Sequence, residues 1–169
     1  MKKEGKWKNM KTKKVFNLNF ENRASIRNLV KIEHFNLPNE CSKFVVTDVM
    51  GGVVETYTNQ NGEYHREDGP ARIVYYKGGQ IKEEAYFLNG EYHRIGAPAM
   101  IKYRKDGTIC EQSYEQHNML HREDGPAYQT FFADGQIYNQ VYYLNNIRYS
   151  FKNEFEFLVF AASLKEEKV

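Results

Sequence analysis

The sequence predicts a mostly β protein, in which an antiparallel meander sheet of about four hairpins is built from repeats. A C-terminal helical cap and a candidate short N-terminal helix complete the predicted fold. Three observations support this class. The 169 residues include 13 Tyr and 11 Phe, which favour strands. A seven-residue motif recurs at a fixed interval, and glycine turns recur at the same interval between strand-like segments.

The recurring motif is His-Arg-Glu-Asp-Gly-Pro-Ala, which stands at residues 65–71 and again, identically, at residues 121–127. Midway between them, residues 93–99 carry a degenerate copy in which Ile95, Gly96 and Ala97 replace Glu, Asp and Gly. We call these three segments the HR turns of copies one, two and three, which are 28 residues apart. The predicted structural turn residues are His65, Arg66, Asp68, Gly69, Pro70, His93, Arg94, Pro98, His121, Arg122, Asp124, Gly125 and Pro126.

Each HR turn has residue types that suit a turn. We expect Asp68 and Asp124 to accept hydrogen bonds from backbone N–H groups one or two residues on, and the following glycine to take the unusual dihedral angle. Proline lacks an N–H group and suits the first position of a strand. Arg66 and Arg122 have carboxylates within reach on both sides.

The segments between the markers read as strands. Gly-Gly or Asp-Gly pairs at 51–52, 78–79, 106–107 and 134–135 predict tight hairpin turns in which both central residues have positive φ. A third marker, Asn-Gly or a variant of it, stands at 61–62, 89–90, 117–118 and 145–146. The eight predicted strands are 44–46, 53–57, 72–76, 81–88, 100–104, 109–114, 129–132 and 137–144.

These motifs resemble the MORN-type repeat families, and most closely a longer variety associated with phages and giant viruses, with units like LNGxxHRxDGPAxxxYxxDGxI. The matching stretches are Leu88–Ala99, Leu120–Ile137 and, as the first copy, Asn61–Ile81. The resemblance covers roughly Phe44 to Tyr149. It implies one meandering sheet stabilised by stacking of neighbouring units, and a scaffold or binding platform, virus- or phage-encoded. Lipid binding is attributed to some such proteins, and some carry an antitoxin or immunity label.

Four segments are predicted along the chain. Residues 1–14 form a basic disordered arm, 15–42 an N-terminal cap that includes a helix over Ala24–Ile32, 43–149 the repeats, and 150–169 a capping helix. Caps are expected because the two edge strands of an open sheet invite aggregation. Ser150 can cap the helix N-terminus. The predicted apolar face of this helix consists of Phe151, Phe155, Leu158 and Val159, with Ala162 further on.

No nucleophile elbow, phosphate-binding loop or zinc-ligand spacing is present, so we expect no enzyme activity, no catalytic or metal-binding residue and no cofactor. The ladder of His65, His93 and His121 invites a metal site. However, successive hairpins advance by about 10 Å, whereas ligand atoms lie about 2 Å from a metal ion. We therefore expect these histidines to make structural hydrogen bonds. The paired acids at 67–68 and 123–124 recur once per unit, as turn residues do.

The N-terminal arm carries a net charge of +6, so the rest of the chain carries −4 of the total of +2. The arm is either a solubilising tail, with Met10 as an alternative start to Met1, or a binder of phosphates or anionic membranes with Trp7 to stack or insert. Its candidate binding residues are Lys2, Lys3, Lys6, Trp7, Lys8, Lys11, Lys13 and Lys14.

Cys41 and Cys110 stand in unlike contexts, and neither a secretory signal nor an apolar run of membrane-spanning length is visible. We therefore expect a soluble intracellular protein with reduced thiols, in the host cytoplasm if it is viral. The tyrosines of the strands either form an exposed binding face or only pack on each other. The expected function is a non-enzymatic scaffold or protein-interaction module. The alternatives are a nucleic-acid or anionic-membrane binder acting through the arm, and an antitoxin- or immunity-like partner protein.

Overall fold

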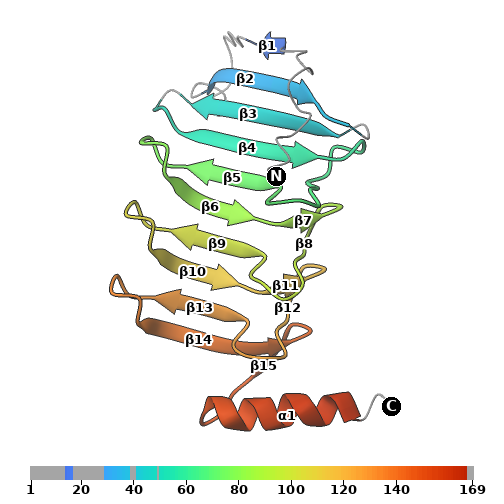
Figure 1. The fold of residues 1–169 in the computed structure, drawn as a ribbon, viewed down its shortest axis with the longest axis vertical. Helices are drawn as coiled ribbons and strands as arrows, with labels where there is room; N and C mark the ends of the chain where they lie inside the picture. The colour runs from blue at the N-terminus through green and yellow to red at the C-terminus, as the bar shows by residue number, and fades with distance from the viewer. Residues whose placement is uncertain (1–13, 17–28, 39–40, 49, 167–169) are drawn as a thin grey trace, which may run out of the picture.

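The computed structural model describes residues 14–16, 29–38, 41–48 and 50–166, which form a long antiparallel meander sheet followed by one helix (Figure 1). The strand order in the sheet is the chain order, β1-β2-β3-β4-β5-β6-β9-β10-β13-β14-β15, and the short strands form the pairs β7-β8 and β11-β12. The bounds are β1 Lys14–Phe16, β2 Leu29–Asn36, β3 Ser42–Asp48, β4 Val53–Thr58, β5 Arg72–Tyr75, β6 Ile81–Ala85, β7 Phe87–Leu88, β8 Glu91–Tyr92, β9 Met100–Tyr103, β10 Ile109–Ser113, β11 Glu115–Gln116, β12 Met119–Leu120, β13 Tyr128–Phe131, β14 Ile137–Leu144, β15 Ile147–Tyr149 and α1 Glu154–Glu166.

The 28-residue period of the sequence is also the period of the strands. β5, β9 and β13 begin 28 residues apart, and so do β6, β10 and β14. Each hairpin pairs with the next, because β6 lies beside β9 and β10 beside β13. The predicted mostly β meander with a C-terminal helix is therefore confirmed.

The glycine turns differ from the prediction. In the turn between β5 and β6, Gly79 has a φ of +85° and its N–H donates to Tyr76 O at 2.9 Å, but Gly78 has no positive φ. The pairing shifts by one residue between Val74 and Tyr75, as in a type I turn followed by a left-handed glycine and a bulge. Gly107 and Gly135 repeat this left-handed geometry.

The turns with two positive φ values lie at the other end of the strands. Asn89 and Gly90, with φ of +49° and +82°, join β7 to β8. Residues 117–118 and 145–146 do the same between β11 and β12 and between β14 and β15. Asparagine and glycine tolerate this region best, which explains their recurrence there. The loops predicted between the large hairpins thus contain short hairpins of their own.

The predicted N-terminal helix is wrong where it can be compared. Residues 29–32 belong to β2, and residues 24–28 lie outside the described residues. β2 pairs with β3 from Leu29↔Asp48 to Asn36↔Ser42, and β1 pairs with β2. The edge of β3 offers a row of unpaired backbone groups, so pairing competes with helix formation. The predicted N-terminal cap therefore extends the sheet, and Lys14, which was assigned to a disordered arm, begins β1.

The C-terminal helix buries a different face from the one predicted. Phe157 and Ala161 are buried against Tyr142 and Leu144 at the end of β14. Of the predicted face, Phe151 packs against this cluster, but Phe155 is 74% exposed. Leu158 and Val159 are exposed as well. The helix is capped by Asn153, whose Oδ1 accepts the N–H of Glu156 at 3.0 Å, and not by Ser150. The Glu156 carboxylate in return accepts the N–H of Lys152, one residue before the cap, so two of the N–H groups at this end of the helix are satisfied.

Charged residues of opposite sign alternate across one face of the sheet. Arg72 pairs with Glu83, and Lys102 with Glu111 at 3.0 Å. Glu83 stands directly opposite Lys102 in the register of β6 and β9. Opposed residues share a face, so charges of opposite sign alternate from strand to strand and favour this register.

Candidate functional site

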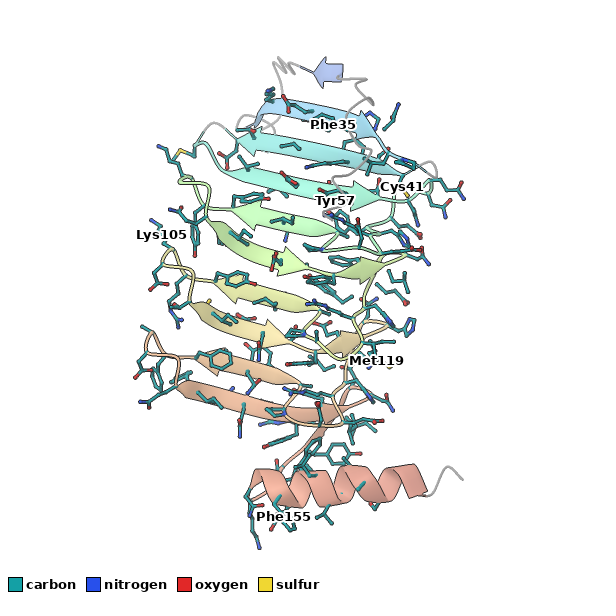
Figure 2. The ribbon with its side chains drawn as sticks, viewed as in Figure 1. Phe35, Cys41, Tyr57, Lys105, Met119 and Phe155 are labelled. Atoms are coloured by element: carbon teal, nitrogen blue, oxygen red, sulfur yellow. The ribbon has the colours of Figure 1, made fainter. Side chains whose placement is uncertain are left out.

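The arginine of each HR turn folds back over a tyrosine at the end of a preceding long strand, either within it, as in β4, or directly after it, as for β6 and β10. The Arg66 guanidinium lies 4.1 Å from the ring centre of Tyr57, which Figure 2 labels on the sheet. Arg94 lies 3.7 Å from the Tyr86 ring, and Arg122 lies 4.0 Å from the Tyr114 ring. These distances are those of cation–π contacts, which hold the flexible arginine side chains in place.

The same guanidinium closes its own turn. Nη1 of Arg66 donates to Pro70 O at 3.4 Å, Nη1 of Arg94 to Pro98 O at 3.2 Å, and Nη1 of Arg122 to Pro126 O at 3.3 Å. The alanine after each proline directly precedes the next strand and is fully buried; these are Ala71, Ala99 and Ala127. Each HR turn is therefore a rigid unit built around one arginine.

The aspartates have a different partner from the predicted one. Asp68 Oδ1 accepts a hydrogen bond from Arg66 Nε at 2.7 Å, and Asp124 Oδ1 accepts one from Arg122 Nε at 2.6 Å. The predicted backbone N–H donors are not their partners. A carboxylate attracts a charged guanidinium more strongly than a neutral amide, so the arginine two residues earlier wins the competition.

The glycines of copies one and three are also used differently. Neither Gly69 nor Gly125 has a positive φ. A Cβ added at Gly69 would meet Arg66 Cζ at 3.0 Å, and one at Gly125 would meet Arg122 Cζ at the same distance. Glycine is needed here because the backbone passes close to the guanidinium, and not because of its conformational freedom.

Copy two has a different turn. Gly96 stands in place of the aspartate and has a φ of +72°, and Ala97 stands in place of the closely packed glycine. Within the described residues, Arg94 is therefore the HR-turn arginine without a carboxylate partner. Ile95, which replaces the glutamate of the other copies, is 77% exposed.

The histidines connect each HR turn to the next copy. His65 Nδ1 accepts the N–H of Asn89 at 3.2 Å, and His121 Nδ1 accepts the N–H of Asn145 at 3.2 Å. His93 is the exception, because its Nδ1 is buried without a hydrogen-bond partner and its ring contacts His117, with 4.3 Å between the ring centres. Burial lowers the pKa of His93, and the nearby His117 lowers it further, whereas Glu91 opposes the shift.

Backbone hydrogen bonds repeat the same link. The N–H of Arg66 donates to Phe87 O at 3.3 Å, that of Arg94 to Glu115 O at 3.0 Å, and that of Arg122 to Tyr143 O at 3.1 Å. Each HR turn is thus hydrogen-bonded to a strand of the next copy along the chain. The three turns form one continuous, rigid row along the sheet.

Two hollows lie between successive HR turns. The hollow between copies one and two has a volume of about 560 Å³, and the hollow between copies two and three has a volume of about 440 Å³. Arg94 and Ile95 line both of them. The first hollow is also lined by Arg66, Glu67, Asp68, Gly69, Tyr86, Phe87, Leu88 and His93. The second is also lined by Gly96, Tyr114, Gln116, His121, Arg122, Glu123 and Asp124.

The predicted anion-binding arm is not part of this site. Lys14 lies in β1, and the other candidate residues, Lys2 to Lys13 with Trp7, lie outside the described residues. Among the residues that the structure describes, no cluster of three or more His, Cys, Asp or Glu side chains could hold a metal ion. No helix in the described part of the chain is long and apolar enough to span a membrane.

Comparison with known proteins found no matching family model, no matching curated protein and no matching solved structure. The site is therefore defined by the geometry of this chain. The sequence motif identified the arginines and aspartates but missed their tyrosine partners. A signal was present, since Tyr86 and Tyr114 each precede the arginine of their copy by eight residues. Tyr57 precedes Arg66 by nine residues, so the spacing of tyrosine and arginine is not the same in all three copies.

Proposed function

We propose that this chain is a non-enzymatic repeat module that binds a partner protein through the row of HR turns. The observation that carries the proposal is the pair of adjacent hollows, each walled by guanidinium groups that the sheet holds in place. Arginine and aromatic side chains dominate binding energy in protein interfaces. A rigid surface also loses little conformational entropy on binding.

The shape favours an extended segment as the partner's contact element. The two hollows lie one after the other along the sheet, and successive copies advance by about 10 Å. An extended peptide rises by about 3.3 Å per residue, so about three residues span one copy. A segment of six to eight residues, roughly two such spans with their ends, would fill both hollows. The two reduced cysteines, Cys41 and Cys110, fit the intracellular setting that we propose with this function.

The test is selection of binding peptides from a random display library against the full-length chain. Binding peptides should protect the backbone amides of 66–69, 94–97 and 122–125 from hydrogen exchange. The glycine turns at the opposite ends of the strands, residues 78–79, 106–107 and 134–135, serve as the internal control. Failure to select any peptide, or protection of the glycine turns instead, would contradict the proposal.

A second candidate function rests on the lysine-rich arm. Seven lysines among the first fourteen residues would bind nucleic acid or an anionic membrane without reading sequence. Binding to duplex DNA or to phosphatidylserine vesicles should then weaken steeply between 50 and 200 mM salt, values typical of such titrations. Deletion of residues 1–13 should abolish it. Binding that ignores salt and survives the deletion would exclude this function.

A further inference from the structure

Three equivalent arginines of the HR turns differ in their carboxylate partners. Arg66 and Arg122 each donate from Nε to an aspartate carboxylate, at 2.7 Å and 2.6 Å. Arg94 makes the equivalent contacts of its own copy, with the Tyr86 ring and with the carbonyl oxygen of Pro98. Its Nε has no hydrogen-bond or ion-pair partner within the described residues. Copy two therefore presents a positioned guanidinium whose carboxylate site is vacant.

The loop around Arg94 keeps that site open. Gly96 occupies the aspartate position, adds no side chain, and would have open space around a Cβ. Gly96 has a left-handed φ of +72°. The next residue is Ala97, at the position where copies one and three need a glycine because the backbone passes close to the guanidinium. The substitutions thus remove the internal carboxylate and reroute the backbone, while the arginine stays on its tyrosine.

An apolar contact lies beside the vacant site. Ile95 is 77% exposed, and both it and Arg94 line the two hollows. In the other copies this position holds Glu67 or Glu123, so the apolar side chain is a feature of copy two. A ligand that places a carboxylate on Arg94 can cover Ile95 with a neighbouring apolar group.

We propose that Arg94 and Ile95 form the anchor of the binding surface, and that they take a carboxylate side chain with an adjacent apolar residue from a partner's peptide segment. This inference rests on the proposed function and names the chemistry of the partner. The intramolecular pairs Arg66–Asp68 and Arg122–Asp124 are its templates, because they place a carboxylate at this position of the guanidinium.

The surrounding charge favours a carboxylate over nucleic acid. Glu67 and Asp68 line one hollow, and Glu123 and Asp124 line the other. Three arginines, Arg66, Arg94 and Arg122, stand among these four carboxylates, and two of the arginines are already paired with Asp68 and Asp124. The hollows therefore carry no excess of positive charge to attract a chain of phosphates. A single carboxylate can meet the guanidinium with one charge, and a charge-assisted hydrogen bond of this kind is about twice as strong as a neutral one.

The experiment uses the full-length chain and two blocked dipeptides, N-acetyl-Asp-Leu-amide and N-acetyl-Asn-Leu-amide, which differ in the negative charge. Binding is read from the Nε–Hε NMR signal of Arg94, identified by its loss in Arg94→Lys. The Asp probe should shift this signal in a saturable way, with an affinity at least about tenfold higher than that of the Asn probe. Equal shifts with both probes, or tighter binding of inorganic phosphate than of the Asp probe, would overturn the inference.

A variant that restores the internal carboxylate provides the sharper test. The triple substitution Ile95→Glu, Gly96→Asp and Ala97→Gly gives copy two the same motif as copies one and three. The new aspartate should occupy Arg94 and reduce affinity for the Asp probe at least about tenfold. The double substitution Ile137→Glu and Ile147→Glu, at exposed positions in β14 and β15, adds the same two negative charges and should leave affinity unchanged.

Arg94→Lys is a second variant, for use if the triple variant folds poorly. Lysine retains the positive charge but lacks the Nε–H donor. The substitution should weaken binding of the library-selected peptides about tenfold. If selected peptides bind both variants as tightly as the wild-type chain, the anchor is wrong although the proposed function stands. If no peptide is selected at all, the proposed function itself fails, whichever way Arg94 responds to the dipeptides.

Discussion

The hydroxyl group of Tyr103 donates a hydrogen bond to Glu84 Oε2 at 2.7 Å. Tyr103 belongs to β9 and Glu84 to β6, so the bond joins two copies of the repeat across the sheet. Burial raises the pKa of Tyr103, and the hydrogen bond to the Glu84 carboxylate raises it further. The equivalent positions in the neighbouring copies hold Tyr75 and Phe131, so this bond is specific to the middle of the sheet.

Tyr103→Phe should lower the free energy of unfolding by about 1 kcal/mol, because the half-buried Glu84 carboxylate loses its donor. Tyr75→Phe is the matched control, since the Tyr75 hydroxyl makes no hydrogen bond within the described residues, and it should change stability little. Urea denaturation of the two variants measures the difference. Equal losses would show that the hydrogen bond contributes nothing.

Gly125→Ala should destabilise the protein by about 1 kcal/mol, as overpacking does at its lower end, because the new Cβ displaces the Arg122 guanidinium from Tyr114 and Asp124. The reciprocal change in copy two, Ala97→Gly, should cost only a few tenths of a kcal/mol, since the backbone there already follows another path. Thermal melts of both variants test this. A larger loss for Ala97→Gly would contradict the close approach at Gly125.

Phe157→Ala should lower the free energy of unfolding by about 3 kcal/mol or more, because its fully buried ring packs on Tyr142 with 4.5 Å between ring centres. Phe155→Ala, on the exposed face of the same helix, should leave stability nearly unchanged. The pair of variants distinguishes the observed helix face from the one that the sequence predicted. Denaturant titrations followed by far-ultraviolet circular dichroism provide the measurement, and the opposite order would favour the predicted face.

Acid should destabilise the protein through His93. The pKa of this histidine is lowered in the folded state, mainly by burial, so the unfolded chain binds a proton first as the pH falls below the ordinary value of about 6.5. The free energy of unfolding should then decrease with falling pH until the folded-state pKa is reached. His93→Gln should flatten this dependence. The urea midpoint is measured at pH 8 and pH 5, on either side of that ordinary value. The midpoint would change equally between the two pH values in both proteins if His93 played no part.

Much of the sheet could be predicted because its causes are local. Strand-forming residues and turn residues act within a few positions, and a 28-residue period multiplies each weak signal by the number of copies. The predicted strand over 137–144 matches β14, and six others differ by one or two residues at their ends. The predicted strand over 81–88 is instead broken at Tyr86 into β6 and β7, which belong to different sheets. The HR turns likewise stood out as motifs, and their arginines and aspartates do lie together.

Local patterns left other features open. The C-terminal helix is apolar on two sides, so its residues alone allow Phe155 or Phe157 to face inward, and docking against β14 selects Phe157. Residues 29–32 suit a helix or a strand, and the unpaired edge of β3 selects the strand. Both choices follow from surfaces that exist only once the sheet has formed.

The sequence thus settled the period, the long strands of the repeats and the identity of the turn residues, because neighbours along the chain encode them. The tertiary structure decided which tyrosine lies under each arginine, why glycine is needed at positions 69 and 125, and that Arg94 is left without a carboxylate. These are contacts between side chains that only the folded sheet brings together, and their energies depend on distances of a few ångströms that residue order does not specify.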